Sequence, residues 1–486
     1  MAQPFVPPCQ EGRIAAEPCP KAAGRNPSAI VKRVGLTASV LASSMAFIDG
    51  SALTVALPAL KNDLSGNLNA VQWVLNGYVL ALAAFTMIGG ALADAYGRAR
   101  ILRLGCAGFA LASIACALAP NAGWLIAARI AQGAAAAAMT PASLALIGEL
   151  YPKEERGRAI GVWAAASALT TAAGPVLGGW LTEEWSWRAI FWINPPIALA
   201  AIFLLQRTKT RRIHEEAPAF DIPGAALLAV ALALFSLGVS SFAPSEGEAI
   251  AAISEPNGGD QGTKAAGFAL LGAALAAAFG FLRWERTAKT PLIPSYLFRS
   301  PSFSALNAAT LAIYASLSIM FFLTPFQLVE TRGLSPTQAG LIFLPLTLSL
   351  GLLSQLVGGL VDRIGARLFL ILGPGIAALS FLLMALLVDR SLFMSVLMPM
   401  GLAGIGLALM VGPLTTAVMA SVADPDEGLA SGVNNTASRI AQMLGVALAA
   451  LFAARAHGFV EGMFLAAALA ALGAFIMAIT RERPTR

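Results

Sequence analysis

The residues of this sequence that could do chemistry are a few charged side chains inside long apolar stretches. Asp49 lies in the stretch 34–60, with fifteen of its residues before it and eleven after it. Because a charge is costly at the centre of a bilayer, an intramembrane acid normally faces a cavity and carries function. Burial also disfavours the charged form of a carboxyl, which would let it exchange protons near neutral pH. We therefore expect Asp49 to carry a proton; the alternative is a permanent structural partner of an arginine.

Two arginines lie in other apolar stretches. Arg129 stays protonated and cannot carry a proton itself, but it can respond to a nearby acid as helices move. A fixed hydrogen bond to backbone carbonyls of the stretch 34–60 would explain this arginine equally well. Arg439 follows Asn434 by about one helical turn. Arg439 could bind an acidic group of a substrate or only tie helices together, and we favour the structural interpretation.

The composition excludes a soluble globular protein. The 486 residues are 57% hydrophobic and 12% charged, whereas soluble domains are about 25% charged. The net charge of +6 fits the excess of basic residues in the cytoplasmic loops of membrane proteins, so no nucleic-acid partner is expected. The four cysteines and two histidines do not have the spacing of a metal site. No motif predicts a cofactor.

Fourteen stretches are long and apolar enough to cross a bilayer, which takes about 20 residues each. They predict an all-α integral membrane protein with fourteen transmembrane helices. The stretches are 34–60, 71–93, 101–119, 123–147, 159–181, 188–205, 222–242, 265–282, 303–329, 338–361, 369–388, 391–420, 430–453 and 462–480. The two weakest, 222–242 and 265–282, flank the polar segment 243–264.

The basic residues indicate which side of the membrane each loop occupies. With the N-terminus inside, the inner segments hold 24 Lys and Arg and the outer segments hold 6, while Arg129 and Arg439 lie within stretches. Such an excess of basic residues is typical of cytoplasmic loops. We expect both termini in the cytoplasm and the segment 243–264 outside.

One loop occurs twice, in the segment Gly90–Arg100 and again 268 residues later. The matching positions are Gly90 and Gly358, Leu92 and Leu360, Asp94 and Asp362, and Gly97 and Gly365. Glycine permits a tight turn, and an aspartate can cap a helix N-terminus. Because each copy follows the second helix of a six-helix block, the fourteen stretches divide into six, two and six. Transporters are often built from such repeats, with the substrate site at the repeat interface.

This repeat predicts five parts of the chain. They are a disordered cytoplasmic tail (1–33), an N-terminal six-helix bundle (34–205), a linker with two extra transmembrane helices (206–302), a C-terminal six-helix bundle (303–480) and a second cytoplasmic tail (481–486).

Four motifs in the sequence resemble those of one family. Gly90–Arg100 resembles the signature loop of the major facilitator superfamily, and Arg129–Gly133 resembles its R-x-x-q-G motif. Asp49–Pro58 resembles the first-span signature of fourteen-span drug:proton antiporters of the EmrB/QacA type, although Thr54 replaces the usual Asn. The residues Gly174, Pro175, Gly178 and Gly179 resemble the G-P-x-x-G-G motif associated with antiporters.

The resemblance implies the major facilitator fold, with two six-helix bundles and two extra linker helices. It implies proton coupling through Asp49 and Arg129. It also implies a loop that switches between conformations, and the residues concerned are Gly90, Asp94, Gly97, Arg98, Arg100, Asp362 and Gly365. The residues that we expect to line a substrate cavity are Trp73, Gln132, Trp163, Tyr314, Asn434 and Arg439.

The function that these features favour is a proton-coupled antiporter that exports amphipathic small molecules or drugs by alternating access. The alternative is a proton-coupled importer of a specific metabolite on the same fold. An ATP-driven pump is disfavoured because the sequence has no G-x-x-x-x-G-K-[ST] motif. An enzyme is disfavoured because no nucleophile, histidine and acid are arranged around a plausible site.

The resemblance also sets the expected surroundings of the protein. We expect a multi-pass protein of the bacterial plasma (inner) membrane that acts as a monomer. Its partners are the lipid bilayer, protons and a small-molecule substrate. A periplasmic adaptor protein is a further partner that the sequence leaves open.

Overall fold

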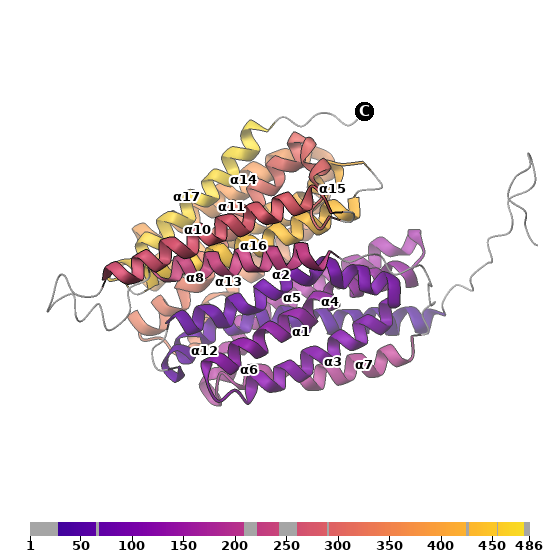
Figure 1. Ribbon diagram of the computed structural model, residues 1–486, viewed down its shortest axis with the longest axis horizontal. Coiled ribbons are helices and arrows are strands. Elements are labelled where there is room, and N and C mark those ends of the chain that lie inside the picture. The colour runs from indigo at the N-terminus through magenta and orange to yellow at the C-terminus, as the bar shows by residue number, and fades with distance from the viewer. Residues whose placement is uncertain are drawn as a thin grey trace, which may run out of the picture.

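The computed structural model describes residues 28–64, 68–208, 221–242, 260–288, 291–423, 427–453 and 455–480. All regular elements within these ranges are helical, and they form two bundles that lie side by side with two further helices along their seam (Figure 1). The expected tails and most of the segment 243–264 lie outside the described residues.

The first bundle holds seven helices, and its best-packed pairs are α2 with α4, α1 with α5 and α3 with α4. Its elements are α1 (Ala29–Asp63), α2 (Leu68–Tyr96), α3 (Arg98–Ala117), α4 (Ala122–Leu150), α5 (Lys153–Glu184), α6 (Ala189–Trp192) and α7 (Asn194–Gln206). The first helix begins earlier than the apolar pattern predicts, because Ser28 caps it by accepting a hydrogen bond from the Val31 N–H.

The second bundle repeats this arrangement, with α11 against α16 and α17, and α14 against α15. Its elements are η1 (Ser295–Arg299), α11 (Pro301–Phe326), η2 (Gln327–Thr331), α12 (Pro336–Ile342), α13 (Leu344–Ile364), α14 (Ala366–Leu386), η3 (Phe393–Leu397), α15 (Met398–Ala420), α16 (Glu427–Ala453) and α17 (Gly458–Ile479).

Two further helices, α8 (Ile222–Ser240) and α10 (Asp260–Glu285), pack on each other along the seam. The helix α8 contacts α2 of the first bundle and α16 of the second. Ser236 of α8 is buried and accepts hydrogen bonds from Gln72 (3.4 Å) and Asn76 (2.9 Å) of α2. Polar contacts of this kind fix the register of a helix in an apolar environment.

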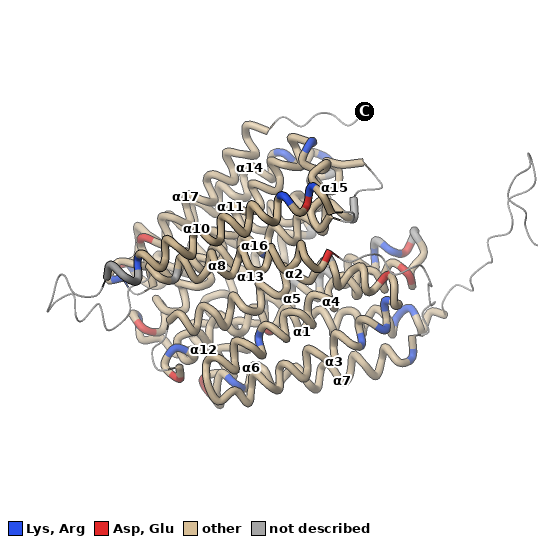
Figure 2. Tube along the Cα trace, viewed as in Figure 1, with Lys and Arg blue, Asp and Glu red and all other residues tan. Residues whose placement is uncertain are grey.

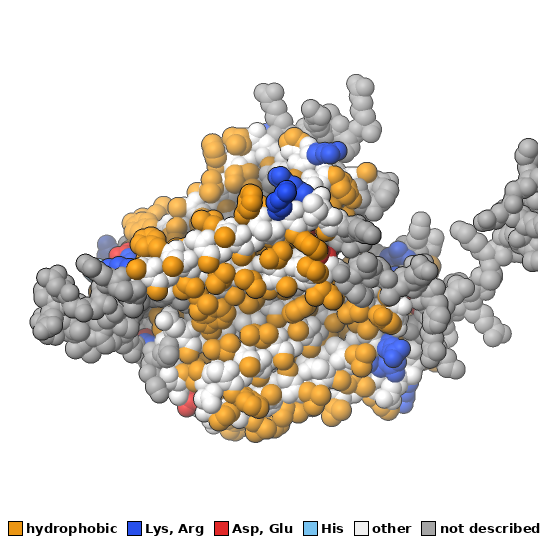
Figure 3. Space-filling view, viewed as in Figure 1, with side chains coloured by type: hydrophobic (Ala, Val, Ile, Leu, Met, Phe, Trp, Pro, Cys, Tyr) orange, Lys and Arg blue, Asp and Glu red, His pale blue; other side chains and the backbone are white. Residues whose placement is uncertain are grey.

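Thirteen helices or runs of adjoining helices in the described residues are long and apolar enough to cross a membrane. The helix α5, which covers the expected stretch 159–181, is not among them, although it packs along α1 over much of its 32 residues. Figure 3 shows a broad field of hydrophobic side chains across the middle of one face, with charged side chains toward the ends. Such a distribution suits the hydrocarbon core of a bilayer.

Two of the expected continuous stretches are interrupted. The stretch 188–205 divides into α6 and α7 at Ile193, and the stretch 338–361 divides into α12 and α13 at Phe343. Each break lies two residues before a proline, Pro195 or Pro345. Proline lacks the N–H that would continue the hydrogen-bond ladder, so the helix restarts there.

The two copies of the repeated loop have the same backbone conformation. Gly97 and Gly365 have φ angles of 96° and 88°, a region that side chains with a Cβ rarely adopt. Both glycines join consecutive antiparallel helices at one end of the molecule, which we call the loop end. The other end, where α1 and α5 finish, is the opposite end.

The two bundles touch closely at the opposite end. The helix α5 packs on α12 and α13, and a Cβ at Gly179 would overlap the Pro336 backbone. The Glu183 carboxylate accepts a hydrogen bond from the Thr337 N–H at 2.9 Å, and Lys61 pairs with Glu330 at 3.4 Å. We call these contacts the opposite-end seam. Hydrogen bonds from Thr337 and Ser335 hold the pKa of Glu183 below its ordinary value.

The loop-end half of α13 is exposed over consecutive residues, including Gly358–Leu360 and Arg363–Gly365. No heavy atom outside the helix itself lies within 4 Å of a Cβ built at Gly351, Gly358 or Gly359. Since α13 meets the first bundle through α5 at the opposite end, the two bundles are closed there and apart at the loop end.

Candidate functional site

A cluster of polar side chains lies at the centre of the first bundle, around Asp49. The carboxylate cluster consists of Asp49 of α1, Ser113 of α3, Arg129 and Gln132 of α4, and Asn194 of α7. Asp49 is fully buried and Arg129 is 1% exposed. Breaking a buried ion pair by removing one partner typically costs about 3–5 kcal/mol, so these two residues depend on each other.

Three donors surround the Asp49 carboxylate. Arg129 Nη1 lies 2.5 Å from Oδ2, while Gln132 Nε2 and Asn194 Nδ2 lie 2.9 Å and 3.1 Å from Oδ1. An ionised carboxylate accepts only, whereas a protonated one must also donate. The geometry therefore fits the ionised form.

A second layer of hydrogen bonds orients the two amides. Ser113 Oγ accepts from Asn194 Nδ2 at 2.9 Å and donates to the Phe191 carbonyl at 2.8 Å. Gln132 Oε1 accepts from Arg129 Nη1 at 2.7 Å, so the Gln132 side chain bridges the arginine and the carboxylate. Because the α6–α7 break places Phe191 and Asn194 beside α3, this break helps to build the site.

Arg129 has several partners inside the first bundle. Beyond Asp49 and Gln132, its Nε donates to the Val74 carbonyl at 3.1 Å, and its guanidinium lies 4.3 Å from the centre of the Tyr78 ring. Gly133 makes this possible, because a Cβ there would overlap the Tyr78 backbone and push α4 away from α2. The expected alternative, a bond to first-span carbonyls, was wrong, since the acceptor belongs to α2.

A cavity of about 270 Å³ lies between the bundles. Twelve of its lining residues come from α1, α2, α4 and α5, and eight come from α11 and α16. Most of them are apolar or carry hydroxyl groups, with Phe47, Tyr78, Tyr314, Phe321 and Phe322 as the aromatic members. Apolar walls with a few polar groups are typical of small-molecule sites.

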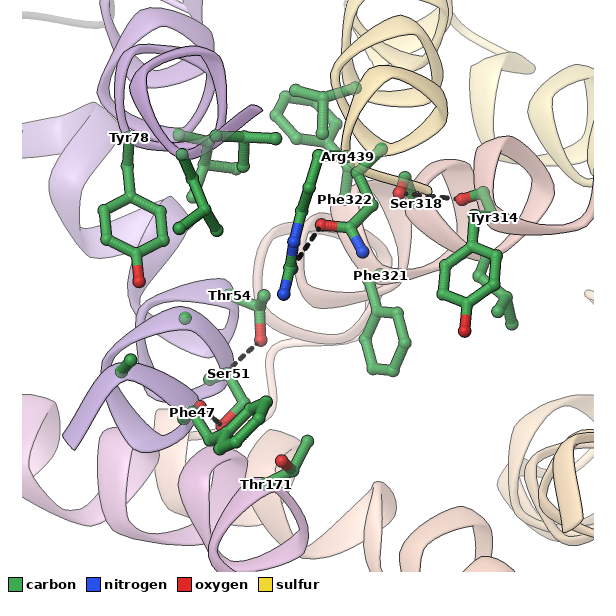
Figure 4. Close-up of a pocket in the computed structure, with 18 of the residues that line it drawn as sticks. Phe47, Ser51, Thr54, Tyr78, Thr171, Tyr314, Ser318, Phe321, Phe322 and Arg439 are labelled. Carbon is green, nitrogen blue, oxygen red and sulfur yellow. Dashed lines mark hydrogen bonds between the residues drawn. The ribbon is translucent and has the colours of Figure 1, made fainter. Parts of the chain in front are cut away.

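The cavity and the carboxylate cluster share one residue. Arg129 lines the cavity, while Asp49 lies behind it and is not part of the wall. Arg439 and Tyr314 also line it, from the second bundle (Figure 4). The described residues of the wall include no Asp or Glu. The surface that a ligand would meet therefore carries basic, hydroxyl and aromatic groups.

Four of the expected cavity residues lie elsewhere. Gln132 belongs to the carboxylate cluster, and Trp73 is half-buried in α2 outside the wall. Trp163 donates to Ser43 Oγ at 2.9 Å and packs edge-on against Phe47, so it supports the wall from behind. Asn434 donates to Asn307 (3.2 Å) and Thr310 (2.8 Å), which ties α16 to α11.

The repeated loop differs from the expectation in one respect. Asp94 is exposed and pairs with Arg98 at 3.1 Å, and the N-cap of α3 is Gly97 without a side-chain hydrogen bond. Asp94 therefore does not cap α3 in this structure, because the tight glycine turn takes that position. Arg98 also donates to the Ala145 carbonyl of α4 at 3.0 Å. Arg100 is exposed, Gly90 lies near Pro141, and the side chain of Asp362 is not among those described.

The glycines of the antiporter-like motif allow three close approaches of α5. A Cβ at Gly174 would overlap Ser51, one at Gly178 would overlap the Ala52 backbone, and one at Gly179 would overlap α12. Pro175 lies within α5, which continues through it from Lys153 to Glu184. The motif thus holds α1 in place directly after Asp49 and joins the two bundles at the opposite-end seam.

Ser113 and Gln442 were not among the site residues that the sequence predicted, and Thr54 stood out only as a replacement in the first-span signature. Asn194 was likewise not among the predicted site residues. Hydroxyl and amide side chains recur throughout apolar helices, where they often bond to their own backbone. Only the rotation of each helix distinguishes Ser113, which faces Asp49, from such residues.

The proteins most similar to this chain include several resistance and export proteins. A multidrug resistance protein, Stp, from Mycobacterium tuberculosis (strain CDC 1551 / Oshkosh) is 36% identical over 85% of this chain and 74% of its own length. A lincomycin resistance protein from Streptomyces lincolnensis is 33% identical over 90% of this chain and 89% of its own length.

Solved structures share the fold at low sequence identity. A peptide transporter in complex with sulfate superposes with a TM-score of 0.65 at 14% identity, over 91% of this chain and 93% of that one. An inward-facing bacterial homologue of the lysosomal transporter Spinster gives 0.63 at 18% identity, over 94% and 99%. The family model matches residues 39–294 and 305–486. The chain is a multi-pass membrane transporter and belongs to the Major Facilitator Superfamily, as the motif resemblance indicated.

Proposed function

We propose that this secondary transporter exports amphipathic small molecules in exchange for protons, with Asp49 as the proton carrier. The observation that carries the proposal is the position of Arg129, which binds the buried Asp49 carboxylate and also lines the cavity between the bundles. A change in the charge of Asp49 therefore reaches the place where a substrate would bind. The resistance and export proteins among its relatives support the direction of transport.

Protonation of Asp49 would release Arg129 toward the cavity. The carboxylate accepts hydrogen bonds from three donors, and the arginine contact is the ion pair among them, so it depends most on the negative charge. A released guanidinium brings charge and hydration water into an apolar chamber. A lipophilic substrate then loses apolar contact area, so the proton and the substrate exclude each other.

In the state that the structure describes, the two bundles touch at the opposite-end seam and are separated at the loop end. Rocking of the two bundles about the central cavity would open the seam and close the loop end, as in alternating access. The pair of loops at Gly97 and Gly365 would then meet the facing bundle, where Asp94 and Arg98 are available for new contacts. A shift of such a two-state equilibrium from about 1:99 to 99:1 takes about 5.5 kcal/mol, which is on the scale of a few weak contacts.

We place the loop end in the cytoplasm. Of the described basic residues outside the cavity, most lie at the loop end, and Figure 2 shows several of them near the ends of the helices there. This orientation puts both termini on the cytoplasmic side of a bacterial inner membrane. It also counts α5 as a fourteenth span. The division at 205 and 303 separates the linker helices from the bundles. We further propose that the protein acts as a monomer.

The replacement Asp49→Asn tests the proton carrier. An asparagine preserves size and hydrogen bonding but cannot release a proton, so accumulation driven by a pH gradient should be lost. Exchange of substrate down its own gradient should persist with a weaker apparent affinity, because the rocking motion does not require that charge but a released Arg129 disfavours the substrate. The measurement is flux in proteoliposomes with and without a pH gradient, using a substrate found by screening.

Full gradient-driven accumulation by Asp49→Asn would show that the proton travels elsewhere. The direction of the same flux separates export from the alternative, proton-coupled import of a metabolite. A matched control is Asp63→Asn, which removes an exposed carboxylate of the same helix.

The replacement Glu183→Gln tests the seam. Because the pKa of Glu183 is lowered, its carboxylate stabilises the closed seam at pH values above the ordinary pKa of a glutamate. This contribution is lost as the pH falls through the lowered pKa. At neutral pH the glutamine should therefore favour opening. We expect labelling of Thr54→Cys by an impermeant maleimide from outside to rise several-fold.

The neighbouring replacement Glu184→Gln changes the same charge and serves as the control. Equal labelling of the cavity cysteine with Glu183→Gln and with Glu184→Gln would show that the seam does not depend on Glu183.

The orientation can be measured with two variants that each carry one added cysteine, in a protein that lacks Cys9 and Cys19; the remaining Cys106 and Cys116 are buried. Arg390→Cys lies at the opposite end and Arg299→Cys at the loop end, and both positions are exposed. Intact cells should label Arg390→Cys with an impermeant reagent and leave Arg299→Cys unlabelled until they are permeabilised. The reverse pattern would contradict the cytoplasmic position of the loop end.

A further inference from the structure

Two arginines line the cavity, and they differ in how fully they are paired. Arg129 binds a carboxylate, an amide oxygen and a backbone carbonyl of three different helices. Arg439 makes one hydrogen bond among the described residues, from Nη1 to Gln442 Oε1 at 3.2 Å. Its Nε is buried and has no hydrogen-bond partner.

The contacts of Arg439 do not tie helices together. Gln442 lies three residues further along the same helix, α16, so the hydrogen bond stays within one element. No carboxylate of the described residues lies within ion-pair distance of Arg439. A guanidinium has five N–H donors and is costly to desolvate unless acceptors reach it. The earlier structural interpretation of this residue therefore has no partner helix to support it.

The Arg439 side chain extends into the cavity from the second bundle. Figure 4 shows it between Tyr78 and Thr54 on one side and Phe321 and Tyr314 on the other. Aromatic walls on both sides would hold a flat apolar body, while the guanidinium offers a fork of donors. A planar guanidinium matches the two oxygens of a carboxylate in a bidentate pair.

We propose that the substrate carries an anionic group, of the carboxylate type, which binds Arg439, and an aromatic body that fills the cavity. This inference rests on the proposed function for the identity of the cavity as the substrate site. It adds the chemical class of the substrate and assigns its anionic end to the second bundle, away from Asp49.

The charge balance of the cavity agrees with an anionic ligand. With Asp49 ionised, its charge cancels that of Arg129, so Arg439 leaves the empty cavity with one net positive charge. An anionic group on Arg439 makes the loaded cavity neutral, and an uncompensated charge in a low-dielectric site is costly.

A matched set of three ligands tests this inference by equilibrium binding to the purified protein. Naphthalene-2-carboxylate, naphthalene-2-carboxamide and naphthalen-2-ylmethylammonium share one aromatic body and differ in charge. Isothermal titration calorimetry is carried out at about pH 7.5, where the carboxyl group of the ligand is ionised. The carboxylate should bind at least about tenfold more tightly than the carboxamide.

The replacement Arg439→Gln should remove this preference and leave carboxamide binding unchanged. Arg439→Lys keeps the charge but loses the bidentate geometry, so it should retain part of the preference. The thermal unfolding midpoint of each variant reports whether it has folded. Asp49→Asn should keep the carboxylate preference, so a failure of proton coupling and a failure of this inference give different results.

Equal binding of carboxylate and carboxamide by the unmodified protein would overturn the inference. Preference for the ammonium compound, binding of none of the three, or a carboxylate preference that survives Arg439→Gln would do the same.

Discussion

The ion pair between Asp49 and Arg129 is the interaction on which the rest of the site depends. Both side chains are buried in the middle of the first bundle, where neither charge could remain without the other. The pair draws in Gln132, Asn194 and Ser113, and so fixes α1, α3, α4 and α7 relative to one another. The glycines at positions 133 and 178 let α2 and α5 approach this core closely.

The cavity follows from the same arrangement. Because Asp49 occupies the inner side of α1, the next turns of that helix present Ser51 and Thr54 to the space between the bundles. The first bundle contributes Arg129, whose guanidinium pairs with Asp49. The second bundle contributes Arg439, whose buried Nε has no hydrogen-bond partner among the described residues.

The sequence predicted the parts of this account that depend on residue type and repeated spacing. Asp49, Arg129 and the two glycine turns were identifiable because charge in an apolar stretch and a duplicated loop are strong signals. The partners were not, since Ala-rich and Leu-rich helices show little difference between their faces. The predicted place of Trp73 in the cavity wall was wrong for this reason, and so was the alternative of a first-span carbonyl as the partner of Arg129.

Proton coupling as proposed depends on Asp49 taking up a proton and releasing Arg129. Infrared difference spectroscopy of the protein in membranes tests this step directly, since a protonated carboxyl has a C=O band that an ionised one lacks. We expect acidification to produce such a band, Asp49→Asn to remove it, and substrate binding to the unmodified protein to diminish it. If Asp49→Asn removes no carboxyl C=O band at any pH at which a proton gradient drives transport, Asp49 is not the group that takes up the proton.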